Sequence, residues 1–248
     1  MCTIEWQRPD GQTDRITHFV KKICMFCIAY PDPPPPTEED NLDRRTRKEE
    51  KRRKFYDRFS SISPVEHPHS ITEEDITVAN GFGARTSKDT WRKHNLLAHL
   101  DELEAIDPNW NLFENVGEEV WQSRKRALRK LLERVMGENG SGIAMSSGTK
   151  VLHLKRPKLI PICDSVVVAR IAGRSLRGTK VEQTIECINI IREIGQNNIE
   201  EIETAVDHLQ SLGEENAYSH ISPLRILDAV LWFDTEARRQ HWSLLGWD

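Results

Sequence analysis

The chain of 248 residues has no apolar stretch close to the roughly 20 residues that a membrane-spanning helix needs. Its longest apolar run, residues 23–30, is too short and contains two cysteines. The N-terminus also lacks the basic start and the apolar core of a secretory signal. We therefore expect no contact with a membrane and an intracellular location, in the cytoplasm or with the DNA of a nucleus or nucleoid.

Cysteine is scarce and irregularly spaced. The five cysteines are an odd number outside any disulfide framework, which is typical of a compartment where thiols stay reduced. Cys24 and Cys27 form a CxxC pair, but no second pair and no nearby histidine pair completes a zinc set. The scattered histidines contain no HExxH motif. We predict neither a metal site nor a cofactor.

Strand-like alternation of apolar and polar residues is nearly absent, and no internal repeat occurs at a solenoid period. Apolar residues instead recur at spacings of three and four, which favours helices. The sequence predicts a mainly α protein, a compact domain of six to eight helices. The expected helices lie near residues 72–81, 87–107, 117–136, 150–156, 181–195, 199–213 and 222–232, and a further helix is expected to begin at Ser165.

The first part of the chain differs in composition from the rest. Consecutive prolines in residues 30–40 favour a stiff, extended linker. Residues 42–59 carry mixed charges, which suit a solvated helix, a partly disordered arm or an arm that binds nucleic acid. We divide the chain into an N-terminal segment, 1–30, a linker with a charged helix or arm, 31–69, and a helical domain, 70–248.

Charge is distributed unevenly, although the net charge is only -4. Residues 150–180 hold eight basic side chains and a single acid, Asp164, whereas residues 182–248 hold thirteen acids and four arginines. The middle of the chain is therefore the part suited to meet an anion. Three interpretations remain open: the basic segment binds nucleic acid phosphates, it binds an acidic partner, or it docks onto the acidic C-terminal third of its own fold.

Four glycines lie in residues 137–150, directly before a short expected helix. Such a segment offers free backbone N–H groups to a phosphate, or it is a flexible loop. It matches neither the Walker pattern nor the dinucleotide fingerprint. Lys150 is expected in the first turn after it, where a helix N-terminus and nearby cations disfavour the protonated amine. Asp164 is expected to be a counter-ion or the N-cap of the following helix.

The residues GTKV followed by KRPKLIPICDSVV resemble the helix-hairpin-helix DNA glycosylases of the 8-oxoguanine class. In that superfamily a GxGTK hairpin grips the DNA backbone, a lysine attacks the sugar C1′ to form a Schiff base, and an aspartate assists electrostatically. The resemblance implies a glycosylase-like helical fold, with DNA as the partner, Lys150 as the nucleophile and Asp164 as the assisting carboxylate. The predicted contacts to nucleic acid are Ser147, Gly148 in the hairpin turn, Thr149, Lys155, Arg156 and Lys158.

The sequence departs from the glycosylase pattern at three points. Ser146 stands where the hairpin usually has a second glycine, and the stretch between Lys150 and Asp164 is shorter than in the family. Pro157 also limits the helix after Lys150 to about two turns. The residues LHLKRPKLIPICDS and PLRILDAVLWF are also similar to an uncharacterised bacterial protein family of unknown function, over most of residues 70–235. That second resemblance implies no activity.

Structural roles are the alternative for each of these side chains. Lys150 also fits the role of a solvated lysine at a helix start, and Asp164 fits that of a helix cap or an ion-pair partner. The other cations also fit a solvated surface. Cys163 could be a nucleophile with His153 as its base, but cysteine is commonly a small core residue. The sequence thus leaves an enzyme, a non-enzymatic binding module and a purely structural segment open.

Overall fold

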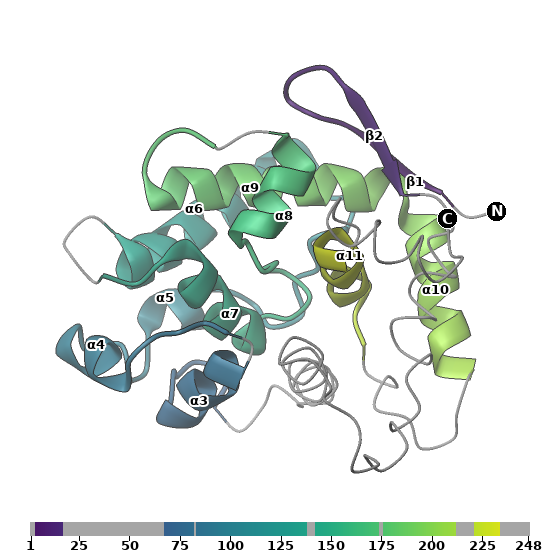
Figure 1. Ribbon diagram of the computed structural model, residues 1–248. Helices are drawn as coiled ribbons and strands as arrows, with labels where there is room; N and C mark the ends of the chain where they lie inside the picture. The colour runs from purple at the N-terminus through teal and green to yellow at the C-terminus, as the bar shows by residue number, and fades with distance from the viewer. Residues whose placement is uncertain are drawn as a thin grey trace, which may run out of the picture.

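A computed structural model describes residues 3–16, 67–81, 83–137, 142–173, 176–211 and 221–233. It is mainly helical and compact, as predicted, with nine helices in these ranges rather than six to eight (Figure 1). The proposed linker, the charged arm of residues 42–59 and the CxxC pair lie outside the described residues. No helix in the described ranges is long and apolar enough to cross a membrane.

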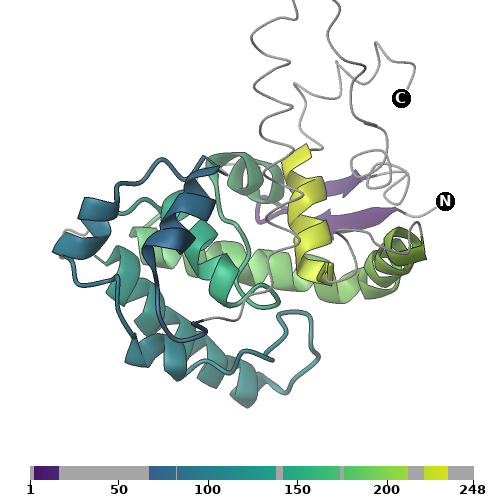
Figure 2. The ribbon, with the colours of Figure 1, turned by 90° about the horizontal axis from the view of Figure 1, so that it is seen from below.

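Two short strands precede the helices, β1 (Ile4–Gln7) and β2 (Thr13–Ile16), and pair as an antiparallel hairpin. Ile4 and Trp6 point to the buried side, and Gly11 adopts a φ of 82° in the turn. The Asn198 side chain holds this hairpin through hydrogen bonds to the N–H and C=O of Glu5, at 3.1 and 3.0 Å. The N-terminal hairpin therefore packs at the end of the helix before Asn198, as two views show (Figures 1 and 2).

The long helix α9 (Lys180–Asn197) runs across the fold and ends near the hairpin (Figure 1). Thr179 and Glu182 form a capping box at its start, in which each side chain accepts the other residue's backbone N–H. The helix continues past Gly195, where the sequence predicted its end. Gly195 is needed for packing, because a Cβ there would clash with the ring of Phe113. Neighbours of α9 are β1 and the helices α6 (Glu118–Met136), α7 (Met145–Lys155), α8 (Ser165–Ala172) and α10 (Ile199–Ser211).

The expected helix over residues 87–107 is wrong in its middle. Ser87 caps α4 (Lys88–Lys93) as predicted, but the chain then leaves the helix and re-enters one only at α5 (Asp101–Glu104). Between them the backbone bonds to a distant segment: Ile71 N–H donates to Ala98 O at 3.1 Å, and Leu100 N–H donates to His69 O at 2.9 Å. These long-range bonds replace helical ones, while the leucines at spacings of three and four are still buried.

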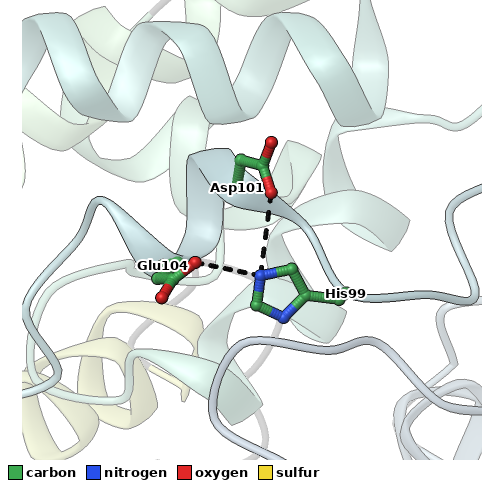
Figure 3. Close-up of side chains that lie close together, drawn as sticks. All are labelled: His99, Asp101 and Glu104. Atoms are coloured by element: carbon green, nitrogen blue, oxygen red, sulfur yellow. Dashed lines mark hydrogen bonds and ion pairs between the residues drawn. The ribbon is translucent and has the colours of Figure 1, made fainter.

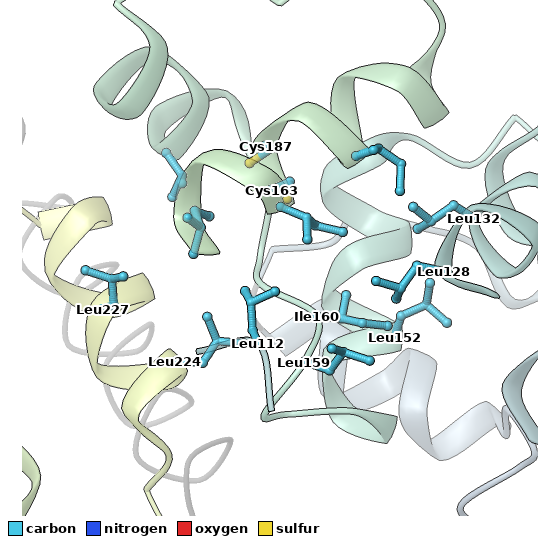
Figure 4. Close-up of a cluster of buried hydrophobic side chains, with 14 of the residues drawn as sticks. Leu112, Leu128, Leu132, Leu152, Leu159, Ile160, Cys163, Cys187, Leu224 and Leu227 are labelled. Atoms are coloured by element: carbon cyan, nitrogen blue, oxygen red, sulfur yellow. The ribbon is translucent and has the colours of Figure 1, made fainter. Parts of the chain in front are cut away.

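The starts of α3 and α11 also agree with the sequence. The Thr72 hydroxyl accepts the N–H of Asp75 at the start of α3 (Glu73–Gly81). The Ser222 hydroxyl accepts the N–H of Arg225 at 3.1 Å, with Pro223 as the first residue of α11 (Pro223–Phe233). A shared core joins α6, α7, α11 and the loop after α7 (Figure 4). Its labelled members are Leu112, Leu128, Leu132, Leu152, Leu159, Ile160, Cys163, Cys187, Leu224 and Leu227.

Candidate functional site

The segment with the predicted site folds as helix α7, a loop and helix α8. Helix α7 already begins at Met145, so Lys150 lies in its second turn rather than its first. The helix ends at Lys155, before Pro157, as the sequence predicted. The loop then leads to Asp164, whose side chain accepts the N–H groups of Val166 and Val167, both at 3.0 Å. Asp164 is therefore the N-cap of α8, one of its two predicted positions.

Gly148 lies inside α7, so its predicted position in a hairpin turn is wrong. The physical reason is close packing of α7 against α6. A Cβ on Gly148 would lie 2.6 Å from Sδ and 2.8 Å from Cγ of Met136. The absence of a side chain at Gly148 lets the two helices approach here, and a contact of this residue with nucleic acid stays a prediction.

The two hydroxyl residues beside Gly148 have partners within the protein. The Ser147 hydroxyl donates to Ala84 O. The Thr149 hydroxyl donates to Met145 O at 2.9 Å and accepts the N–H of Cys163 at 3.1 Å. The bond between Thr149 and Cys163 ties the start of α8 to the middle of α7. Because these residues are the chain neighbours of Lys150 and Asp164, the two predicted catalytic residues are brought to the same part of the fold.

Access differs between these two residues. Lys150 is 7% exposed, whereas Asp164 is half-buried at the start of its helix. The amine of Lys150 is thus largely covered by protein in the free chain. A reaction at Lys150 requires that the bound substrate uncovers this side chain.

The three predicted cations after Lys150 have different surroundings. Lys155 is 6% exposed, and its Nζ lies 2.8 Å from Oδ2 of Asp75 on α3. Lys158 is exposed. Arg156 is fully buried and bonds to backbone carbonyls of distant segments: Nε donates to Ile106 O at 2.9 Å, Nη1 to Pro68 O at 2.8 Å, and Nη2 to Leu103 O.

Arg156 therefore joins the end of α7 to α5, to the residue Ile106 that follows α5, and to the segment before α3. Burial lowers the pKa of its guanidinium to about 10, which still leaves it charged at neutral pH. A buried cation surrounded by carbonyl oxygens stabilises the fold from within. The contacts of Lys155, Arg156 and Lys158 with nucleic acid stay predictions, and the first two would have to leave their present partners.

A further basic residue of the segment, Arg170, pairs with Asp14 of the hairpin and lies 4.8 Å over the ring of Trp6. Lys155 pairs with Asp75. Both acids belong to the N-terminal third of the chain. The partners described for these two cations are therefore acids of the N-terminal third, and docking onto the acidic C-terminal third stays a prediction.

A buried polar group lies between α7 and α11. The carboxylate of Asp228 accepts the N–H of Ile162 at 3.0 Å and lies 4.0 Å from Nδ1 of His153. The same Nδ1 lies 2.6 Å from Ile160 O, to which it must donate, because a carbonyl only accepts. His153 and Asp228 are each 2% exposed. The contacts fix both side chains at the loop that leads to Asp164.

Burial is the largest cause of the pKa shifts of both His153 and Asp228. Burial, with a further contribution from the charge of Asp164, raises the pKa of Asp228 to about 7, although Arg225 and the Ile162 N–H lower it. Burial and the charge of Arg225 lower the pKa of His153 to about 3. Strongly shifted pairs of this kind occur at functional sites and also in structural networks. Near neutral pH, His153 is neutral and Asp228 is close to its midpoint.

Sequence reasoning missed Asp228 and Arg225. A signal was present: they are the only charged residues in the otherwise apolar PLRILDAVLWF and stand three positions apart. Residues three positions apart share a helix face, so both charges necessarily lie on one face of a helix that has little other polar surface.

Cys163 lies in the core beside Cys187 (Figure 4). Burial raises the pKa of the Cys163 thiol well above its usual value, and the neighbouring Cys187 raises it further. A thiol that stays protonated is a poor nucleophile. Of the two alternatives for Cys163, a nucleophile or a core residue, its surroundings therefore favour the core residue.

The fold and the site define a compact, mainly helical protein with a buried carboxylate and histidine between α7 and α11. The chain belongs to a family of unknown function (DUF6308), whose match covers residues 42–235. This confirms the predicted membership of an uncharacterised family, over a longer range than the sequence resemblance indicated. No curated protein and no solved structure matches the chain.

Proposed function

We propose that the protein binds DNA and acts as a base-excision glycosylase and lyase, with Lys150 as the nucleophile and Asp164 as the assisting carboxylate. The observation that carries the proposal is the hydrogen bond between the Thr149 hydroxyl and Cys163 N–H. Thr149 is the chain neighbour of Lys150, and Cys163 is the chain neighbour of Asp164. The bond therefore brings the two residues that the resemblance singles out to one part of the fold. The glycosylase resemblance itself rests on the residues of this segment alone.

The proposed reaction uses each side chain in one role. The lone pair of the neutral Lys150 amine forms a bond to the sugar C1′, and the glycosidic bond breaks as the base leaves with the bonding electrons and takes up a proton. Loss of a proton from nitrogen and opening of the sugar ring give the Schiff base. The Asp164 carboxylate stabilises positive charge that develops at C1′. A base inside the duplex must first be flipped out of the stack.

Two features of the free chain bear on this proposal. Lys150 is 7% exposed, so DNA must displace the groups that cover it. The Asp164 carboxylate is already oriented, because it accepts two N–H groups at the start of α8. The proposal therefore requires a rearrangement around α7 and little around the start of α8.

Borohydride trapping tests this chemistry. We expect a covalent complex with duplex DNA that carries 8-oxoguanine, uracil or an abasic site, and no complex after Lys150→Ala. Asp164→Asn keeps an oxygen that can cap α8, and should reduce the rate of trapping by at least about tenfold. Lys130→Ala, which removes an exposed lysine of α6, is the matched control and should trap as the wild type does. Thermal melting of each variant verifies that it is folded.

Absence of an adduct with the wild type, or an adduct unchanged by Lys150→Ala, overturns the catalytic proposal. The alternative is a non-enzymatic module whose basic segment, residues 150–180, contacts phosphates or an acidic partner. Exposed Lys158 is the residue that best fits such a contact in the free chain. In that case DNA binding without trapping should weaken steeply with salt, and Lys158→Ala should reduce the salt dependence.

A further inference from the structure

Three side chains that could ligate a metal converge on the outer side of the α4–α5 connection, away from the segment discussed above. His99 lies in the loop before α5, and Asp101 and Glu104 lie at the two ends of that helix. Figure 3 shows both carboxylates directed at the same imidazole nitrogen. His99 Nε2 lies 3.0 Å from Oε2 of Glu104 and 3.7 Å from Oδ1 of Asp101. One donor atom of each residue lies within 4.8 Å of the other two.

These separations suit a shared metal ion. Bonds of about 2.0–2.2 Å from one ion to nitrogen and oxygen ligands hold neighbouring donor atoms roughly 3–4 Å apart. The two distances from His99 Nε2 already fall in that range. Only small rotations of exposed side chains are needed to direct all three donors at one point. The pattern HxDxxE is not a common spacing of metal ligands, so the residues alone did not indicate a metal site here.

The backbone that carries the three residues is held in place. Leu100 and Leu103, which alternate with the ligands, are 3% and 0% exposed. His99 forms an isolated bridge with Ser70, and its ring meets the ring of His69 edge-on at 6.3 Å between centroids. On the inner side, Arg156 donates to Leu103 O and Ile106 O. Fixed main chain reduces the entropy that ordering the ligands would cost.

We propose that His99, Asp101 and Glu104 form a binding site for a divalent transition-metal ion, with Zn²⁺ as the representative. The ligand set decides the class of ion. An imidazole with two carboxylates suits zinc, manganese or iron, whereas calcium and magnesium take oxygen ligands. The three side chains are 50%, 97% and 62% exposed, so water or a substrate oxygen completes the coordination from the solvent side. This site is independent of the proposed action on DNA.

Calorimetric titration with Zn²⁺ tests the proposal on the full chain after treatment with a chelator. Cysteines and other histidines can bind zinc elsewhere, so the comparison is between variants. We expect His99→Ala to bind one equivalent less than the wild type. Asp101→Asn and Glu104→Gln should raise the dissociation constant of that same equivalent at least about tenfold, the loss typical even of an outer-shell change. His208→Ala, an exposed histidine of α10, is the matched control and should keep that equivalent.

The alternative is an ion pair of protonated His99 with the two carboxylates and no metal. It predicts equal zinc binding by the wild type, His99→Ala and Asp101→Asn, which overturns the proposal. A loss in His99→Ala alone, with both carboxylate variants unchanged, also overturns it. Asp101 is 97% exposed, so its variant keeps the test valid even if His99→Ala does not fold. A negative zinc titration says nothing about the borohydride trapping of DNA, and a negative trapping experiment says nothing about zinc binding.

Discussion

Arg156 and His99 lie on opposite sides of the same junction between chain segments. Arg156 approaches from inside, where it is fully buried and donates to the carbonyls of Pro68, Leu103 and Ile106. The His99 side chain approaches from outside and is half exposed beside Asp101 and Glu104. The interior cation is surrounded by backbone oxygens at fixed positions, whereas the side chains of the outer cluster are largely exposed to solvent. Charge buried in this way stabilises the fold, and charge left outside is available to a ligand.

The largest effect that separates the two sides is expected at Arg156. Arg156→Met keeps most of the side-chain volume but leaves the carbonyl groups of Pro68, Leu103 and Ile106, and that of Lys155, without this donor. We expect a loss of about 3–5 kcal/mol in the free energy of unfolding, measured by urea denaturation. Lys158→Met is the control, since Lys158 is exposed two positions further on, and should change stability by no more than about 0.5 kcal/mol.

A loss below about 1 kcal/mol for Arg156→Met would contradict the structural role. It would mean that the carbonyl groups find other donors, and it would return Arg156 to the candidates for a contact with phosphate. Arg156→Lys offers a further distinction. It keeps the charge but cannot reach three separate carbonyls at once, so its stability should lie between those of the wild type and Arg156→Met.

The contrast between Arg156 and Lys158 also shows what the sequence could not supply. Both stand in KRPK, and composition alone treats them as one basic patch. Their different burial follows from where helix α7 ends and from the distant segments that meet it there. Three of the carbonyl groups that accept from Arg156 belong to residues 50 and more positions away. Local pattern carries no information about such partners.

Local signals were sufficient wherever the determining interaction is itself local. The caps at Thr72, Ser87, Asp164 and Ser222 are bonds to N–H groups two or three residues on, and all were predictable. The hairpin also had local signals, in the alternation of Ile4 and Trp6 and the Asp-Gly turn, so the expectation that strands are nearly absent missed it. Helix spacing failed between α4 and α5, because the buried leucines fit an irregular chain as well as a helix.

A smaller and pH-dependent effect is expected at the buried pair of Asp228 and His153. The pKa of Asp228 is raised from 3.8 to about 7, so the folded state binds its proton more tightly than the unfolded state. This contribution to stability is fully present below about pH 4 and is lost as the pH rises to about 7. His153 has the opposite sign: its pKa is lowered from 6.5 to about 3, so its contribution is lost as the pH falls from about 6.5 to about 3.

The two contributions oppose each other between about pH 4 and 6.5, and Asp228→Asn removes one of them. The stability of the variant should therefore rise more steeply with pH than that of the wild type, by up to about 1.4 kcal/mol per pH unit. Urea denaturation at pH 4.5, 5.5 and 6.5 measures this difference. Asp207→Asn, at an exposed acid of α10, should keep the wild-type slope. Parallel curves for Asp228→Asn and the wild type would show that the Asp228 carboxyl is ionised in the fold throughout.

The smallest effect is expected on the outer side of the junction. Asp101→Asn in chelator-treated protein should change the free energy of unfolding by no more than about 0.5 kcal/mol, because the side chain is 97% exposed and its 3.7 Å contact with His99 is screened by water. The measurement is the urea midpoint beside that of Arg156→Met. A loss as large as that of Arg156→Met would mean that the exposed cluster supports the junction as the buried guanidinium does. A negligible loss leaves the convergence of His99, Asp101 and Glu104 without a role in stability, which is the condition expected of side chains that serve a ligand.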